Sequence, residues 1–244
     1  MVTMNKYIKL GIGLILQALG IALVISSGTT FAITSFNQGI SNTFLISYGT
    51  ASMLVELMTI AINYCFKEKI GLTTVASAVL NGYLVDMFLL LVPTISLSLI
   101  YLPFGAIIMG TGFYFMTVSG MGNSSSNGLM NVFQKLTGKS VGLIRTIEDV
   151  SFMALGFLLG GTVNIGTLIL TFGFGYLLNF IYRLFKFDPT KVQHQYLGGG
   201  KMKLPRMDVM NFLKHKAKVY ELTIEQLKTN IKSLKNEEKT YSKQ

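Results

Sequence analysis

Six stretches of about 20 predominantly apolar residues restrict the fold of this chain more than any other feature of its sequence. A helix of about 20 residues crosses the hydrocarbon core of a bilayer, and in lipid each backbone N–H and C=O must be paired within the protein. We therefore expect an all-α integral membrane fold with six transmembrane helices, at residues 8–27, 45–66, 71–92, 98–118, 142–161 and 164–182.

The composition supports this class of protein. Charged residues make up 13% of the chain, about half the share in a water-soluble domain, and the mean hydropathy is +0.52. These values exclude a disordered chain and argue against a water-soluble enzyme. The chain has one Cys and two His, and the expected membrane body contains no His. We therefore expect no catalytic set, no metal site and no cofactor, and we do not expect an enzyme.

Lysines alternate between the loops of the expected spans. They precede the first span and return in every second loop, whereas the loops between carry no charge; they are Lys6, Lys9, Lys67, Lys69, Lys135 and Lys139. Short loops rich in Lys and Arg lie on the cytoplasmic side. The pattern predicts a multi-pass protein of the cell membrane with both termini in the cytoplasm. The first stretch is longer than the apolar part of a typical signal peptide, so we count it as a span.

The two halves of the body resemble each other at an offset of 93 positions. Six pairs match: Gly49 and Gly142, Glu56 and Asp149, Thr74 and Thr167, Gly82 and Gly175, Tyr83 and Tyr176, and Asp86 and Asn179. Repeats of three spans would lie in opposite orientations, like the inverted repeats of secondary transporters. The alternative is that apolar helices resemble each other through shared composition, and the sequence leaves both interpretations open.

Three short motifs in the second half resemble those of one family. They are GMGNSSSNGL (120–129), TGKSVGLIRTIE (137–148) and GGTVNIGT (160–167). They resemble the bacterial YczE/YyaS/YitT membrane proteins, the YczE branch in particular, over about residues 6–185. The resemblance implies a fold and a location in a membrane rather than a substrate. The chain departs from the family pattern at Ser125 and Asn127, which replace a Pro-x-Asp pair, and at Asn164, which replaces a glycine.

Acidic residues within the expected spans are candidates for function, because a charge at the centre of a spanning helix costs about 2.5–3.5 kcal/mol. Glu56 lies near the middle of the second span, and Asn63 follows it on the same polar stripe. This stripe is either a protonatable or cation-binding site on a pathway or a structural hydrogen-bond network. Asp86, near the outer end of the third span, is either a pathway residue or an interfacial carboxylate.

A second charged group opens the fifth span. Arg145, Glu148 and Asp149 lie within one helical turn, where their charges can pair. They either fix the helix through an ion pair or form a gated anion or proton site near the cytoplasmic mouth. The polar segments 30–45 and 127–138 are too short to span and are expected to be re-entrant or interfacial.

Glycines mark the expected close contacts and turns. Gly156 and Gly160 have the four-residue spacing that lets membrane helices approach each other. Gly161 and Gly166 surround the expected turn between the fifth and sixth spans. Gly120 and Gly122 precede a run of serines, where a broken helix could line a cavity.

The end of the chain is basic. It holds 14 of the 21 Lys and Arg after residue 182, so we divide the chain into a six-span domain (1–185), a linker (186–206) and a basic cytoplasmic helix (207–240). Apolar residues at alternating spacings of three and four over 210–234 indicate either a coiled coil, and hence a homo-oligomer, or one amphipathic helix on anionic lipid head groups. Beside a bilayer, that anionic leaflet rather than nucleic acid is the expected partner.

Two functions remain open at this stage. Polar residues within spans and the repeat favour a small-molecule or ion permease with proton or cation coupling. The basic tail favours a membrane scaffold or regulator that transports nothing and docks a cytoplasmic partner.

Overall fold

A computed structural model describes residues 5–92, 98–122 and 124–197 of the chain. All regular elements within these residues are helices, as expected for an all-α protein. The predicted basic helix at 207–240, its coiled-coil seam at 210–234 and the second part of the linker lie outside the described residues.

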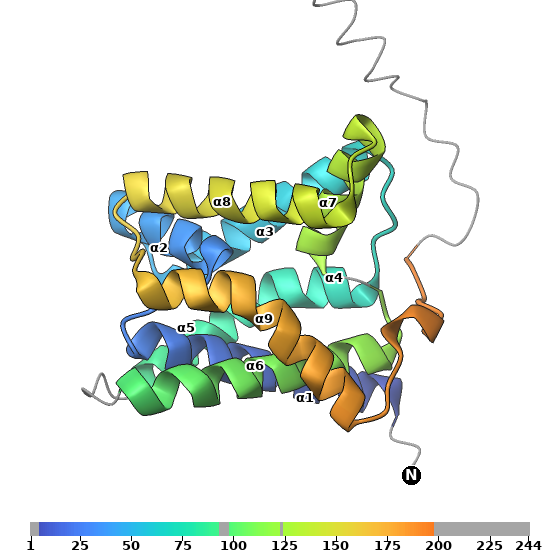
Figure 1. Ribbon diagram of the computed structural model, residues 1–244, viewed down its shortest axis with the longest axis horizontal. Helices are drawn as coiled ribbons and strands as arrows, with labels where there is room; N and C mark the ends of the chain where they lie inside the picture. The colour runs from blue at the N-terminus through green and yellow to red at the C-terminus, as the bar shows by residue number, and fades with distance from the viewer. Residues whose placement is uncertain (1–4, 93–97, 123, 198–244) are drawn as a thin grey trace, which may run out of the picture. The chain divides into compact units, whose positions relative to one another are not determined.

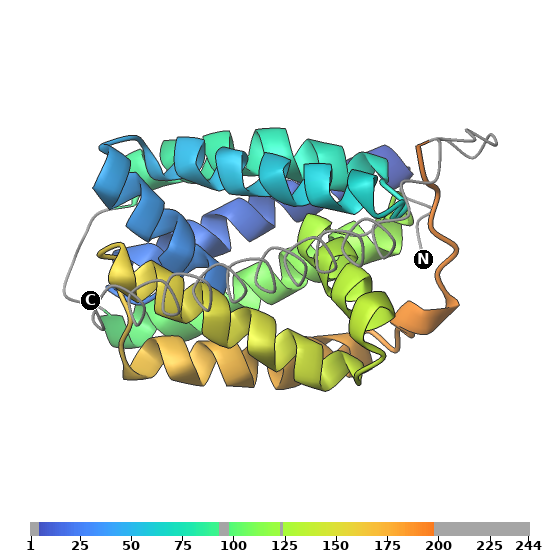
Figure 2. The same ribbon diagram turned by 90° about the horizontal axis from the view of Figure 1, so that it is seen from above.

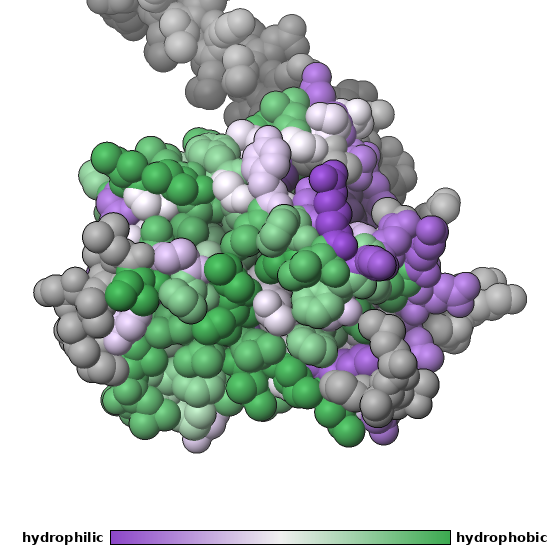
Figure 3. Space-filling view, turned by 60° about the horizontal axis from the view of Figure 1, so that its bottom comes forward, coloured by the Kyte–Doolittle hydropathy of each residue, from purple (hydrophilic) through white to green (hydrophobic). Residues whose placement is uncertain are grey.

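One layer of the helical body consists of the longest apolar helices (Figure 1). It contains α1 (Lys6–Ser26), α6 (Ser98–Ser119), α9 (Ile165–Leu184) and a continuous helix of α4 (Leu72–Ala76), a π turn (Ser77–Asn81) and α5 (Gly82–Leu91). Each of the four is long and apolar enough to cross a membrane. Apolar side chains cover most of the face seen in Figure 3, as expected for helices against lipid.

The other layer consists of α2 (Ala32–Phe44), α3 (Tyr48–Cys65), α7 (Ser125–Thr137) and α8 (Val141–Leu158). Helices α2 and α3 meet at an angle of 117°, and together they are long and apolar enough for a fifth span that is broken between them. By length and composition the described residues therefore offer four or five spans, fewer than the six expected. Two of the expected spans account for the difference: α3 qualifies only together with α2, and α8 carries three charged residues among its 18.

The segments expected to be re-entrant or interfacial are short helices. They coincide with α2 and α7, which have 13 residues each. A 13-residue helix is about 20 Å long and cannot cross a core of about 30 Å. Seen from above, α2 and α7 lie between α3 on one side and α8 on the other (Figure 2).

Helices α1 and α6 hold the first layer together through glycines. They run antiparallel, because Gly13 lies against Met116 and Gly20 against Met109. A Cβ atom on Gly20 would lie 2.5 Å from the backbone nitrogen of Met109. Membrane helices pack this closely where small residues meet, since van der Waals contact rather than hydrophobicity drives their association.

The helices of the two halves begin at matching positions. Helices α2, α3 and α4 begin at residues 32, 48 and 72, and α7, α8 and α9 begin at 125, 141 and 165. Each start in the second half thus lies 93 positions after its counterpart. This is the offset at which the two halves of the sequence were aligned.

After α9, residues 185–197 run back across the helix ends as a strap. The Gln195 N–H donates to the Gly120 carbonyl at 2.6 Å, and the Leu197 N–H donates to the Ile70 carbonyl at 2.8 Å. The ammonium group of Lys6 donates to the side chain of Gln195 at 2.7 Å. Partial burial lowers the pKa of His194 within the strap, so this imidazole stays neutral at pH 7. The strap ties the start of α1 to the links that precede α4 and α7.

Candidate functional site

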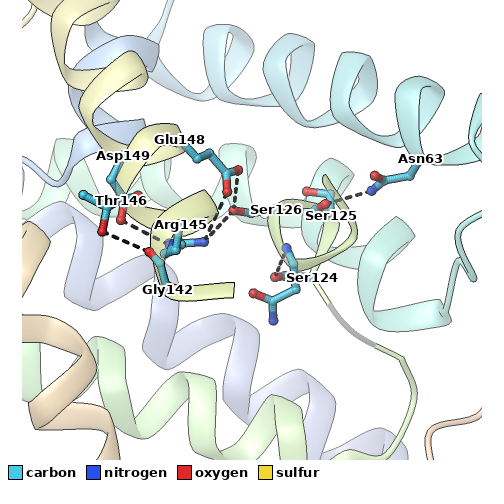
Figure 4. Close-up of polar contacts among 10 residues, drawn as sticks. Asn63, Ser124, Ser125, Ser126, Gly142, Arg145, Thr146, Glu148 and Asp149 are labelled. Carbon is cyan, nitrogen blue, oxygen red and sulfur yellow. Dashed lines mark hydrogen bonds and ion pairs between the residues drawn. The ribbon is translucent and has the colours of Figure 1, made fainter. Parts of the chain in front are cut away.

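The start of α7 organises the polar residues of the second layer. Ser124 caps this helix, and its hydroxyl accepts a hydrogen bond from the backbone N–H of Asn127 at 3.4 Å. A serine in this position satisfies one of the unpaired N–H groups at a helix start. The next two residues, Ser125 and Ser126, then direct their hydroxyls toward different neighbouring helices (Figure 4).

Ser125 connects α7 to α3. Its hydroxyl donates a hydrogen bond to the carboxylate of Glu56, and its backbone carbonyl accepts one from the Asn63 side chain at 2.8 Å. Both Ser125 and Asn63 are buried. Two residues of the predicted polar stripe, Glu56 and Asn63, therefore hold one residue of α7 between them.

Ser126 connects α7 to α8. Its hydroxyl accepts a hydrogen bond from the Arg145 guanidinium at 3.1 Å and lies 3.5 Å from the Glu148 carboxylate (Figure 4). Arg145 also donates through Nε to Asp149 at 3.2 Å, whereas its nearest approach to Glu148 is 4.0 Å. Glu148 is 6% exposed, while 43% of the Arg145 side chain is accessible.

Five of the six predicted pathway residues thus meet around one helix start. We call the α7 cluster the set of Glu56, Asn63, Ser124–Ser126, Arg145, Glu148 and Asp149. The sixth, Asp86, lies elsewhere, because its carboxylate accepts a hydrogen bond from the backbone N–H of Gly49 at 2.7 Å. Sequence reasoning identified the serine run as flexible backbone with hydroxyls that could line a cavity, but it did not predict which side chains these hydroxyls contact. Their position directly before a polar helical segment was the available signal.

A neutral polar group lies around α2. Tyr48, Asn37 and Thr34 are buried there, and the Gln38 amide oxygen accepts from the backbone N–H of Thr162 at 2.8 Å. Sequence analysis did not single out these residues, because uncharged polar side chains are common in membrane helices. Among the described residues, α2 contains no charged side chain, whereas α3, α7 and α8 each carry at least one.

Three of the glycines singled out in the sequence adopt positive φ. Gly120 and Gly122 have φ of 67° and 109° on the link that leads into α7, and Gly160 has φ of 78°. Residues with side chains rarely adopt these angles. A Cβ on Gly160 would meet open space, so this glycine turns the chain after α8 rather than packing beside Gly156 as its spacing suggested.

The other three let α2 and the link before it approach α8 and α9. Gly156 and Gly161 both lie against Ser35, and a Cβ on Gly156 would come within 2.7 Å of the Ser35 carbonyl carbon. Gly166 lies against Thr29, where a Cβ would be 2.9 Å from the methyl group. These glycines shape the backbone around the second layer and carry no chemistry of their own.

The α7 cluster can hold charge within an otherwise apolar body. It contains three carboxylates and three hydroxyls, whose oxygens are suited to binding protons or hard cations, and one guanidinium, which pairs with a carboxylate. No group of three His, Cys, Asp or Glu that could hold a metal ion occurs within the described residues.

Apolar helices around a charged interior cluster define an all-helical membrane protein. The chain belongs to the family of unknown function DUF6198, whose model matches residues 4–183. This match, together with the relatives, confirms the resemblance to the YczE-type proteins.

Three relatives are similar over most of their length. The uncharacterized membrane protein YczE of Bacillus subtilis is 25% identical over 69% of this chain and 81% of its own. The uncharacterized protein YyaS of the same organism is 26% identical over 67% of this chain and 86% of its own. An uncharacterized protein of Haemophilus influenzae is 28% identical over 68% of this chain and 80% of its own. No solved structure matches the chain.

Proposed function

We propose that this chain is a small-molecule or ion permease of the cell membrane, with transport coupled to protons or to a cation. The observation that carries the proposal is the α7 cluster. It places Glu56 of one half and Glu148 of the other at the start of a single short helix. Charged groups within a membrane protein usually mark the path of a substrate or an ion, because their cost must be offset by function or pairing.

We further propose six spans, with α3 and α8 crossing the bilayer and both termini in the cytoplasm. Each of these helices has 18 residues and is about 27 Å long, close to the thickness of the core. The bond between Lys6 and Gln195 supports termini on one side, because it joins the start of α1 to the strap after α9. The lysine alternation then assigns that side to the cytoplasm.

Reciprocal contacts support an inverted repeat. Asn63 of α3 lies against Gly128 of α7, and Gly156 of α8 lies against Ser35 of α2. Positions 63 and 156 differ by 93, and so do positions 35 and 128. The short helix of each half therefore contacts the long helix of the other half at equivalent positions.

The turns repeat this exchange. The Asn42 side chain donates to the Gly160 carbonyl at 2.7 Å, in the turn before α9, and Lys135 forms an ion pair with Glu68 in the turn before α4. Asn42 and Lys135 are again 93 positions apart. In transporters with inverted repeats the site lies between the halves, which is where the α7 cluster brings α3, α7 and α8 together.

Flux through reconstituted protein tests the permease. We expect at least one of a panel of small neutral, anionic and cationic solutes to enter proteoliposomes faster than empty vesicles, measured by light scattering. Glu56→Gln is close in shape and keeps an acceptor for Ser125, so the protein should insert normally while flux falls at least about tenfold. Asp86→Asn is the matched control, since it also removes an acid from a spanning helix but lies outside the cluster.

Two outcomes would favour the scaffold instead. One is the absence of accelerated flux for every solute in the panel. The other is normal cellular activity of both Glu56→Leu and Asp149→Asn at wild-type expression, since a scaffold that binds its partner through the tail has no use for these carboxylates.

A further inference from the structure

Glu148 is the least solvent-exposed acidic side chain of the α7 cluster. Only 6% of the residue is exposed, and one carboxylate oxygen, Oε2, accepts no hydrogen bond among the described residues. The other oxygen receives a long hydrogen bond of 3.5 Å from the Ser126 hydroxyl (Figure 4). A buried carboxylate with so few donors is costly in its ionised form unless a positive charge lies beside it.

Arg145 does not fully supply that charge. Its Nε donates to Asp149 at 3.2 Å and its Nη1 donates to Ser126 at 3.1 Å, whereas Nη1 lies 4.0 Å from the free oxygen of Glu148. A guanidinium held in a hydrogen bond to one carboxylate neutralises that partner first. The closer ion pair of the cluster is therefore Arg145 with Asp149, and one positive charge faces two carboxylates.

The neighbouring helices supply no second cation within the described residues. Helix α2 carries no charged side chain, and α3 contributes only the carboxylate of Glu56. The lysine of α7, Lys135, lies in its last turn and pairs with Glu68. The partial positive charge of the α7 start, about half a unit, is shared between Glu56 and Glu148.

We infer that Glu148 is a cation-binding residue, at which an alkali-metal ion and a proton replace each other. In the exchange the protonated carboxyl releases its proton and the metal ion takes its place, so the net charge of the site does not change. The hydroxyl of Ser126 and the free carboxylate oxygen are hard oxygen donors, which alkali ions prefer. Cation binding at Glu148 does not depend on the proposed permease. Only the further statement that this cation is the coupling ion of transport rests on the proposed function.

Thermal unfolding of the purified full chain tests binding without any transport assay. At pH 8 we expect NaCl or KCl to raise Tm by about 3 °C relative to choline chloride of equal ionic strength. At pH 6 the rise should shrink, because protons compete for the same oxygen. Glu148→Gln should abolish the dependence on the cation at both pH values, whereas Asp86→Asn, which lies outside the cluster, should keep it.

Three results would overturn the inference. They are equal Tm of the wild type in sodium, potassium and choline salts, a cation effect that does not weaken at low pH, and loss of the effect in Glu56→Gln but not in Glu148→Gln. The first two need no variant, so the test holds even if Glu148→Gln fails to fold. A cation effect without any flux would refute the permease and leave the binding site, whereas flux without a cation effect would do the reverse.

Discussion

The carboxylate of Asp86 accepts a hydrogen bond from the backbone N–H of Gly49, in the first turn of α3. The first N–H groups of a helix lack partners within the helix, and a negative charge there also favours its dipole. Gly49 lets the two segments meet, because its missing side chain leaves room for Gly82 and Asp86. Asp86 thus anchors α3 against α5.

This role predicts a difference between two substitutions of Asp86. Asp86→Asn keeps an acceptor for the Gly49 N–H, so the protein should fold and any flux should be unchanged. Asp86→Leu leaves that N–H without its acceptor, at a cost of about 1–3 kcal/mol. Thermal unfolding of the purified variants measures both. Equal Tm values for Asn and Leu would show that the bond contributes nothing to stability.

A second prediction at the scale of residues concerns two glycines of α1. Gly20→Ala should destabilise the protein by about 1–3 kcal/mol, because the new methyl group would meet the backbone of α6 at Met109. Gly11→Ala is the matched control on the same helix, where a Cβ has nothing within 4 Å. The yield of monodisperse protein and its Tm give the comparison. The close contact would be unimportant if both variants behaved alike.

At the scale of elements, α4 and α9 begin in the same way. The hydroxyl of Thr74 accepts from the Gly71 N–H at 3.1 Å, and that of Thr167 accepts from the Asn164 N–H at 3.2 Å. Asn164 adds two bonds of its own, from the Thr167 N–H at 2.9 Å and to the Gly28 carbonyl at 2.8 Å. The asparagine that replaces a family glycine therefore caps α9 and ties it to the end of α1.

Two substitutions separate these roles of Asn164. Asn164→Ala removes the cap and the tie and should cost about 1–2 kcal/mol. Asn164→Asp keeps the acceptor for Thr167 and loses only the donor to Gly28, so it should cost less. Unfolding in a thermal gradient ranks the variants. An aspartate variant as unstable as the alanine variant would assign the stability to the tie rather than to the cap.

The sequence predicted elements better than their contacts. Apolar length located all the long helices, although only α1, α4 with α5, α6 and α9 are each long and apolar enough to cross a membrane. The polar stripe identified Glu56 and Asn63 together. The sequence did not predict that Glu56 and Asn63 would both bind Ser125, because these hydrogen bonds depend on where α7 folds back against α3. Asp86 and Glu56 look equivalent in sequence, yet one caps a helix and the other joins the cluster. Only the packing of distant segments distinguishes them.

At the scale of the whole molecule, the proposed topology predicts which positions are accessible from each side. In a Cys65→Ser background, Leu45→Cys should react with an impermeant maleimide from outside the cell, and Lys139→Cys should react only after permeabilisation. Both positions are exposed, with Leu45 91% accessible between α2 and α3. Position 35 lies in the uncharged segment that the sequence places outside the cell, so it would be an obvious choice for labelling. Its side chain is fully buried, however, and a cysteine there should not react. Labelling of Lys139→Cys in intact cells would exclude the proposed orientation.

The antiparallel pair of α1 and α6 limits how such a protein can move. Glycines of α1 and α6 meet backbone to backbone at two levels, at Gly13 with Gly112 and at Gly20 with Gly105. Sliding either helix by one residue would drive the side chains beside each glycine into the opposite backbone. The pair, with one helix from each half, therefore forms a rigid unit. If the chain is the proposed permease, any change between inward-open and outward-open forms would have to come from the other helices, α3 and α8 with the short α2 and α7 among them.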